Sequence, residues 1–278
     1  MSVALITGAT GGIGRELALL AARDGYDLIL TARSERRLAA VAQAIARDCG
    51  DRVHITTIAL DLAEPDAARR LHERTAGAGL AVDVLVNNAG FAEWTGFLDA
   101  DWERQRAMMQ VNMAALAELA YRYGRDMRTR GRGRMLNIAS VAATMAGPYM
   151  AMYFATKAFV RSLGEALAYE LRGTGVTVTT VCPGPTVTGF EKAAHMAGRN
   201  FFTMTRPASA ASLARFAWRR TMRGSVLGYH GPTAKAGAFA ERALPRALSR
   251  RIAAFMNGGN PGSQQRNGQP PSQGDQSR

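Results

Sequence analysis

The chain has 278 residues, a hydrophobic content of 47% and a formal net charge of +13. This hydrophobic content is enough to form a buried core, so wholesale disorder is excluded. The sequence has no run of about 18 apolar residues and no signal-peptide pattern, and we therefore expect neither a membrane span nor secretion. Two cysteines, Cys49 and Cys182, are too few for a disulfide framework, and we therefore expect a reduced, cytoplasmic protein.

Short apolar runs alternate with helical periodicity along most of the chain, which is typical of βαβ units. The runs are apolar on both faces, so we predict a doubly wound, Rossmann-type α/β fold whose parallel sheet of about seven strands has helices on both faces. The predicted strands span residues 2–6, 27–32, 53–58, 82–87, 134–139, 176–181 and 225–229. The predicted helices span residues 12–24, 34–48, 64–77, a long stretch within 101–129, and 149–172.

The remaining segments interrupt this alternation. Residues 185–224 hold a loop, a stretch with Met and Phe, and a helix from about residue 208, which we interpret as a substrate lid and the helix after it. Residues 241–256 predict a basic amphipathic helix that docks on a membrane surface, contacts another subunit or packs on its own domain. We thus expect a single catalytic domain over 1–256, and the polar composition of 257–278 predicts a disordered tail.

A glycine-rich turn with the spacing G-x-x-x-G-x-G joins the first strand to the first helix. Glycines let the backbone approach a pyrophosphate, which is stabilised by the positive N-terminus of the helix that follows. We predict that this turn binds a dinucleotide; the alternative is a tight turn without a ligand. The residues assigned to the cofactor here are Gly8, Thr10, Gly12, Ile13 and Gly14.

Arg33 follows the second strand at the position where an enzyme selective for NAD usually has an acidic residue for the ribose hydroxyls. A guanidinium group suits a 2′-phosphate instead. Arg33, assisted by Arg37 on the next helix, therefore predicts NADP (NADPH) as the cofactor. The alternative is an exposed arginine at the start of a helix.

Tyr153 and Lys157 are four residues apart on a predicted helix, so their side chains share one face. Ser140 follows the fifth strand at the sheet edge where the cofactor turn lies. A free tyrosine has a pKa of about 10, and a neighbouring ammonium group lowers it. Because the chain has 32 Arg and only 3 Lys, a lysine at this position favours a specific role for a compact ammonium group. The alternative is a surface lysine.

These motifs resemble, in order and spacing, those of the classical short-chain dehydrogenase/reductase (SDR) family over residues 1 to about 190. The resemblance implies an active oxidoreductase in which Tyr153 donates a proton to a substrate carbonyl whose oxygen is also bound by Ser140. It implies further that Lys157 binds the nicotinamide ribose and lowers the pKa of Tyr153, and that Asn112 holds a water in the proton relay. It also implies a homodimer or homotetramer, and no metal.

The same resemblance implies further cofactor contacts at the ends of the third, fourth and sixth strands. These are Asp61, Leu62, Asn88, Ala89, Gly90, Pro183, Gly184, Thr186 and Thr188, besides Tyr153 and Lys157 themselves.

Apolar residues around the predicted pocket favour an apolar or amphipathic carbonyl or alcohol substrate, although each of them could instead belong to the core. Beyond them, Arg215, Arg219 and Arg223 predict a basic stripe near the pocket mouth. We therefore hypothesise a 3-oxoacyl thioester, held on a phosphorylated or acidic carrier such as coenzyme A or an acyl carrier protein, or a related lipid-like ketone. The apolar residues are Phe91, Trp94, Met145, Met150, Met152, Phe190, Met196, Phe201, Phe202 and Met204.

The positive charge is concentrated in residues 121–278, which carry 23 basic and 6 acidic residues, whereas residues 1–120 carry 12 and 16. This distribution suits an anionic partner such as lipid or nucleic acid, or solvated arginines alone. The six arginines between Arg122 and Arg134 have no aromatic stacking platform beyond Tyr121 and Tyr123, so we expect no nucleic-acid binding. An NADP-binding regulatory protein without turnover is the other alternative, and the intact Ser140, Tyr153 and Lys157 set disfavours it.

Overall fold

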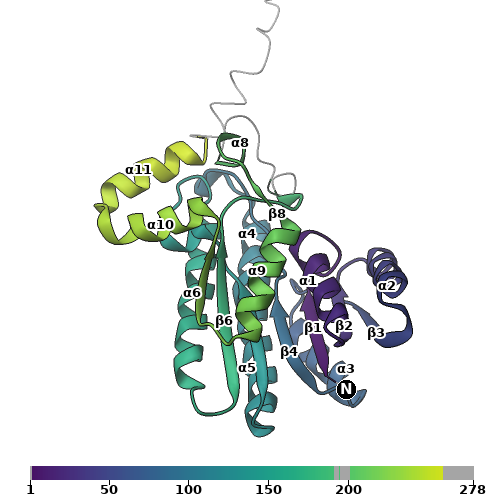
Figure 1. Ribbon diagram of the computed structural model, residues 1–278. Coiled ribbons are helices and arrows are strands. Elements are labelled where there is room, and N and C mark those ends of the chain that lie inside the picture. Colours follow the sequence, from purple (N-terminus) through teal and green to yellow (C-terminus); the bar gives the residue numbers. More distant parts are fainter. Residues whose placement is uncertain (1, 191–193, 195–200, 259–278) are drawn as a thin grey trace, which may run out of the picture.

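A computed structural model describes residues 2–190, 194 and 201–258 (Figure 1). Within these ranges the main sheet has seven parallel strands in the order β3-β2-β1-β4-β5-β6-β9, which confirms the predicted fold class. Every strand boundary falls within two residues of its predicted position. The strands are β1 (Val3–Thr7), β2 (Asp27–Ala32), β3 (Ile55–Ala59), β4 (Val82–Asn87), β5 (Gly133–Ile138), β6 (Val176–Pro183) and β9 (Leu227–His230).

Helices cover both faces of the sheet because alternate strand residues point to opposite sides. In β1, Ala4 and Ile6 join the core under one layer of helices, whereas Val3 and Leu5 join the core under the other. The first layer consists of α1 (Gly12–Arg23), α2 (Glu35–Cys49) and α9 (Ala210–Met222). The second includes α3 (Ala67–Gly77), α5 (Leu116–Thr129) and α6 (Ala151–Glu170).

The predicted long helix within 101–129 is interrupted in its middle. It consists of α4 (Trp102–Met109), a π-helical turn η3 (Gln110–Ala115) and α5. A π turn inserts one residue into the helical ladder, and such turns are frequent at functional sites.

The predicted helix over 241–256 is wrong in its boundaries. The chain forms α10 (Pro232–Ala243) and α11 (Arg246–Met256), with Leu244 in an extended conformation between them. Pro245 explains the break, because a proline disfavours helical geometry in the residue before it. Of the three open alternatives for this segment, the structure shows packing on its own domain, since Ala253 and Asn257 are buried. Asn257, assigned by composition to the tail, is thus part of the fold, and residues 259–278 lie outside the described residues.

The segment 185–224 contains two parts, a short pair of strands and a long helix. The first holds the short parallel pair β7 (Thr186–Val187) and β8 (Ala208–Ser209), with α8 (Phe201–Met204) between them in sequence. The second is α9, which packs against α1 and the sheet through Leu213, Ala217 and Trp218. The helix α9 therefore belongs to the core of the domain.

The connections diverge between β1 and β4. From β1 the chain proceeds to β2 and β3 on one side, and the next strand, β4, lies on the other side of β1. In open α/β sheets such a divergence leaves a crevice at the carboxyl ends of the strands, where ligands bind. No described helix is long and apolar enough to cross a membrane.

Candidate active site

A cleft of about 1370 Å³ opens at the carboxyl ends of the strands. It brings together all but two of the predicted site residues. Gly14 and Asn112 do not line the cleft and lie behind its surface. The predicted residues that line it are Gly8, Thr10, Gly12, Ile13, Arg33, Asp61, Leu62, Asn88, Ala89, Gly90, Ser140, Tyr153, Lys157, Pro183, Gly184, Thr186 and Thr188.

The glycine-rich turn between β1 and α1 is packed too closely for side chains. A Cβ atom on Gly8 would lie 2.9 Å from Nδ2 of Asn88, and one on Gly12 would lie 2.9 Å from Cβ of Thr188. A Cβ atom on Gly14 would overlap the carbonyl oxygen of Gly8. The α1 N-terminus also has no side-chain cap, since Gly11 occupies that position. Bare backbone and uncapped N–H groups fit a bound pyrophosphate.

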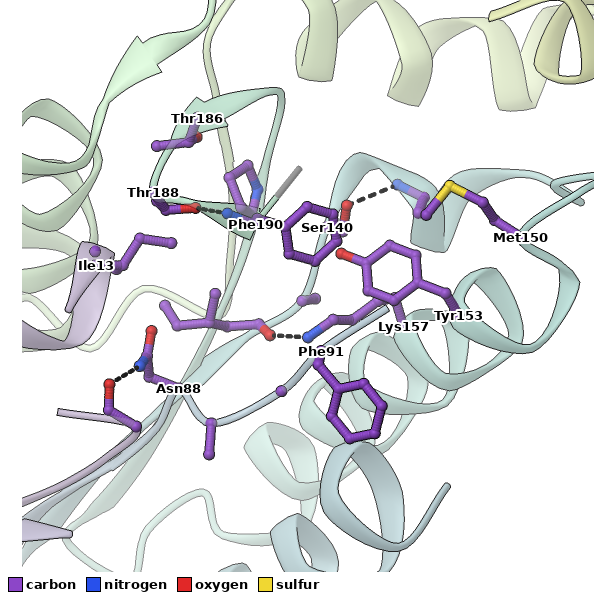
Figure 2. Close-up of a pocket in the computed structure, with 18 of the residues that line it drawn as sticks. Ile13, Asn88, Phe91, Ser140, Met150, Tyr153, Lys157, Thr186, Thr188 and Phe190 are labelled. Atoms are coloured by element: carbon purple, nitrogen blue, oxygen red, sulfur yellow. Dashed lines mark hydrogen bonds between the residues drawn. The ribbon is translucent and has the colours of Figure 1, made fainter. Parts of the chain in front are cut away.

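Thr7 joins the ends of β1 and β4 behind this turn. Its Oγ1 accepts hydrogen bonds from the backbone N–H groups of Asn88 (3.0 Å) and Ala89 (2.9 Å) and donates to the carbonyl of Val86 (3.2 Å). The Asn88 side chain donates in turn to the carbonyls of Thr7 (2.9 Å) and Gly8 (3.3 Å). Asn88 therefore acts on the cleft by fixing the backbone around it (Figure 2).

Two arginines lie where β2 ends. Arg33 and Arg37 both line the cleft, together with Ser34. Ser34 caps α2 by accepting a hydrogen bond from the backbone N–H of Arg37 (3.4 Å), and the Arg37 guanidinium reaches back to the carbonyl of Thr10 (3.3 Å). This end of the cleft is consequently positive, as a phosphate group requires.

Tyr153, Ser140 and Lys157 meet deep in the cleft. Tyr153 and Lys157 are 8% and 6% exposed and share one face of α6. Nζ of Lys157 donates to the carbonyl of Ile138 (2.9 Å) and lies 5.8 Å from the centre of the Tyr153 ring. Figure 2 shows the Tyr153 hydroxyl turned towards Ser140, whose Oγ also accepts a hydrogen bond from the backbone N–H of Ala142 (3.1 Å).

Burial controls the protonation of both groups. It raises the pKa of Tyr153 to about 12, with the hydrogen bond to Ser140 acting in the opposite direction. It lowers the pKa of Lys157 to about 8. The loss of water around the phenol is the largest influence on the Tyr153 pKa, and the Lys157 ammonium group is bound to the carbonyl of Ile138. The lowering of the Tyr153 pKa by Lys157 stays a prediction. At pH 7 the Tyr153 side chain is thus protonated and neutral.

Asn112 lies in the π turn and is 1% exposed. Its Oδ1 accepts from the backbone N–H of Phe91 (3.1 Å), and its Nδ2 donates to the carbonyl of Phe91 (2.9 Å) and to Oγ1 of Thr156 (3.1 Å). The side chain therefore holds the segment after β4 against α6. Its role in binding a water stays a prediction.

The loop after β6 closes the cleft from the other side. The backbone N–H of Gly184 donates to the carbonyl of His230 (3.1 Å), and Oγ1 of Thr186 donates to the carbonyl of Gly184 (3.0 Å). Oγ1 of Thr188 accepts from the backbone N–H of Phe190 (3.3 Å), whose ring centre is 5.3 Å from that of Tyr153. The predicted cofactor loop thus leads directly to an aromatic contact with the candidate catalytic tyrosine.

Beyond Tyr153 the cleft is largely apolar. Among the residues predicted for this pocket, Phe91, Met145, Met150 and Phe190 line it. Trp94, Met152 and Met204 do not line it, Met196 lies outside the described residues, and the side chains of Phe201 and Phe202 are not described.

The second wall of this pocket consists of α10 and α11, and none of its residues was predicted as part of the site. The start of α10 was detectable, because Gly231 and Pro232 are typical of a helix N-terminus. What no local pattern indicates is that this helix lies against Val141, next to Ser140. The wall residues are Thr233, Ala236, Gly237, Ala240, Leu244, Ser249, Ile252, Ala253, Met256 and Asn257.

The predicted basic stripe is not at the pocket mouth. Arg215 and Arg219 lie on α9 and Arg223 follows it directly, and none of the three lines the cleft. The helix runs from β8 towards Gly224, where an added Cβ atom would lie 3.0 Å from the side chain of Thr177, near the opposite end of β6. Helical spacing correctly predicted a shared face, but it could not show which end of the sheet that face approaches. The predicted position of the stripe at the pocket mouth is therefore wrong, and these arginines do not support a thioester carrier there.

Comparison with known proteins agrees with this geometry. The family model for short chain dehydrogenases matches residues 2–197. An uncharacterized oxidoreductase of Staphylococcus saprophyticus is 35% identical over 182 residues, which cover 66% of this chain and 77% of that protein. A very-long-chain 3-oxoacyl-CoA reductase of Laccaria bicolor is 34% identical over 177 residues, or 63% of this chain and 52% of that protein.

The solved structures include a short-chain dehydrogenase from Sphingobium yanoikuyae in complex with NADPH. It superimposes with a TM-score of 0.76 at 28% identity, and the match covers 99% of both chains. A family match over most of the chain, a parallel sheet and a cleft that joins a glycine-rich turn to Ser140, Tyr153 and Lys157 lead to one conclusion. The chain belongs to the short-chain dehydrogenase family of oxidoreductases.

Proposed function

We propose that this protein is an NADP(H)-dependent oxidoreductase that interconverts an apolar or amphipathic carbonyl compound and the corresponding alcohol. The observation that carries the proposal is the position of Tyr153. Its buried hydroxyl lies beside Ser140 and Lys157, where the glycine-lined part of the cleft meets the apolar part. At this position the Tyr153 hydroxyl is within reach of both a dinucleotide and an apolar substrate.

The residues fit a phosphorylated dinucleotide. The close packing of Gly8, Gly12 and Gly14 leaves a bare backbone for the pyrophosphate, and Arg33 and Arg37 provide two guanidinium groups for a 2′-phosphate. When bound, the cofactor supplies or accepts the hydride. The NADPH in the Sphingobium structure supports the choice of cofactor.

The chain itself supplies the proton chemistry. With its pKa raised by burial, Tyr153 remains protonated at neutral pH and can donate to a carbonyl oxygen. Ser140 adds a second hydrogen bond to that oxygen, and the ammonium group of Lys157 stabilises the negative charge left on the phenol oxygen.

The pocket walls favour a bulky, lipid-like substrate. They consist of methionine, phenylalanine and aliphatic side chains from four separate segments, including Met145, Phe190, Leu244 and Ile252. The name of the Laccaria relative supports the same class, so a 3-oxoacyl thioester remains a candidate within it. As for other members of the family, we propose a homodimer or homotetramer, and we place the enzyme in the cytoplasm.

The first experiment measures NADPH oxidation with ketones, aldehydes and 3-oxoacyl thioesters of increasing chain length. We expect turnover to rise with chain length and to disappear in Tyr153→Phe. The matched control is Tyr169→Phe, which makes the same chemical change at an exposed position of α6. Turnover that survives Tyr153→Phe would contradict the mechanism, and NADPH binding without turnover across the panel would favour a regulatory role.

The cofactor choice is tested by binding. Each guanidinium group that contacts a phosphate adds a charge-assisted bond of about 1.5–3 kcal/mol, so Arg33→Ala should weaken NADPH binding by about tenfold or more and leave NADH binding unchanged. Arg36→Ala is the control, because Arg36 is an exposed arginine on α2 that does not line the cleft. Equal effects on NADPH and NADH would overturn the assignment.

A further inference from the structure

The wall formed by α11 lies outside the segment that defines the family. The family match ends at residue 197, whereas α11 begins at Arg246 and lines the substrate end of the cleft with Ile252, Ala253 and Met256. Figure 1 shows α10 and α11 as an elbow beside the upper end of α6. The position of this elbow therefore shapes the pocket of this particular chain.

The core contacts of α11 are few. Ala253 is the one buried residue of the helix, while Leu248 is 45% and Phe255 is 60% exposed. At its start the helix is joined to α10 through Leu244 and Pro245. Packing alone thus fixes α11 weakly, and its position depends on what holds its other end.

Asn257 ties that other end to the rest of the domain through two hydrogen bonds. Asn257 follows α11 directly and is 5% exposed. Its carbonyl accepts from Nε1 of Trp94 (2.7 Å), and its Nδ2 donates to the carbonyl of Pro148 (2.8 Å). Trp94 follows β4 and Pro148 precedes α6, so the two bonds connect the end of α11 to the segment after β4 and to the loop between Ser140 and Tyr153.

Trp94 is itself tied to the catalytic helix. Its ring packs in one buried cluster with Met150 and Tyr153. Its backbone N–H donates to the carbonyl of Ala194 (3.1 Å), and the backbone N–H of the next residue, Thr95, donates to the carbonyl of Tyr149 (2.9 Å). A displacement of Asn257 would therefore shift the residues at the start of α6, where Tyr153 lies.

We propose that Trp94 and Asn257 form a clip that holds α11 over the substrate end of the cleft and thereby sets the size of the substrate. Both are positioning residues, because they act through the wall rather than on the reacting atoms. The proposal rests on the proposed function in so far as it concerns substrates. The structural part, that the clip fixes α11, stands independently of it.

Amide hydrogen exchange tests the structural part. Trp94→Phe removes the indole donor and keeps an aromatic ring, whereas Asn257→Ala removes the side-chain donor and keeps the backbone acceptor. We expect each variant to speed exchange in residues 246–256 by about fivefold, the effect of losing one net hydrogen bond, and to leave α1 unchanged. Arg250→Ala, an exposed change on the same helix, should have no effect. Unchanged protection of α11 in both variants would overturn the proposal.

Kinetics test the specificity part. With a ladder of ketones from small to bulky, we expect kcat/KM for the bulky members relative to the small ones to change by about fivefold in each variant, mainly through KM, while the Kd for NADPH stays constant. Faster exchange with an unchanged size preference would refute the role in specificity. If the wild-type enzyme reduces none of the ketones, aldehydes and 3-oxoacyl thioesters, the proposed function fails, and the exchange data still decide whether the clip exists.

Discussion

Replacing Gly14 by alanine should disrupt the junction between β1 and α1. A Cβ atom at this position would lie 2.6 Å from Nδ2 of Asn88 and would overlap the carbonyl oxygen of Gly8. Neither neighbour can yield easily, because one is backbone and the other is held by the carbonyls of Thr7 and Gly8. The helix must therefore move away from the turn.

The expected loss of unfolding free energy in Gly14→Ala follows from these contacts. Overpacking of this kind costs about 1–3 kcal/mol, and weakening the Asn88 hydrogen bonds adds about 1 kcal/mol. We expect Gly14→Ala to lose about 2–4 kcal/mol of unfolding free energy, a fall in Tm of about 5–10 °C for a domain of this size. Since the displaced N–H groups line the proposed pyrophosphate site, the affinity for NADPH should fall as well.

Urea denaturation and NADPH titration measure the two effects. Gly77→Ala is the matched control, because Gly77 lies in α3 with no atom within 4 Å of an added Cβ. There the substitution should stabilise the protein by up to about 1 kcal/mol through helix propensity. A Gly14→Ala variant as stable as wild type would refute the argument from close packing.

Three further outcomes follow from the site. Arg219→Glu with Arg223→Glu should leave KM unchanged for thioesters and simple ketones alike, because neither arginine lines the cleft; a raised KM for thioesters alone would contradict that placement. Asn112→Ala leaves the N–H and carbonyl of Phe91 without their partner and should cost about 2–3 kcal/mol in urea denaturation, whereas a loss below about 0.5 kcal/mol would show that the bonds are replaced. Burial lowers the pKa of Lys157 from 10.5 to about 8. Between pH 8 and pH 10.5 the lysine is therefore protonated in the unfolded chain and neutral in the folded chain. Its contribution to the unfolding free energy consequently increases as the pH rises through this range. The unfolding free energy of wild type minus that of Lys157→Met should therefore increase from pH 8 to 10.5, and a flat difference would contradict the burial effect.

The sheet was predictable because each strand has a recognisable apolar pattern in its own few residues. A buried strand such as β4 is apolar on both faces, and that pattern alone gives its boundaries. The cofactor end was predictable for a similar reason, since the glycine-rich turn and Arg33 each follow a strand directly, and the carboxyl ends of parallel strands meet at one edge.

The substrate end was not predictable in the same way. Whether Trp94 points into the pocket or supports it depends on Asn257, which is 163 residues away in sequence. Helical periodicity gave the shared face of Arg219 and Arg223 but not the direction in which α9 crosses the sheet. Two features of this end could have been predicted locally: the start of α10 from Gly231 and Pro232, and the break at Pro245 from the conformational restriction of the residue that precedes a proline.

The connection between Trp94 and Asn257 also has a consequence for biosynthesis. Folding during translation proceeds from the N-terminus, so β1, β2 and β4, which border the proposed cofactor site, leave the ribosome before α6 and α11. The segment that bears Tyr153 comes next, and Asn257 comes only after α11. A growing polypeptide therefore contains the glycine-rich turn and Arg33 of the proposed dinucleotide site before the loop that follows β6, and the wall that α11 adds to the substrate pocket comes later than both.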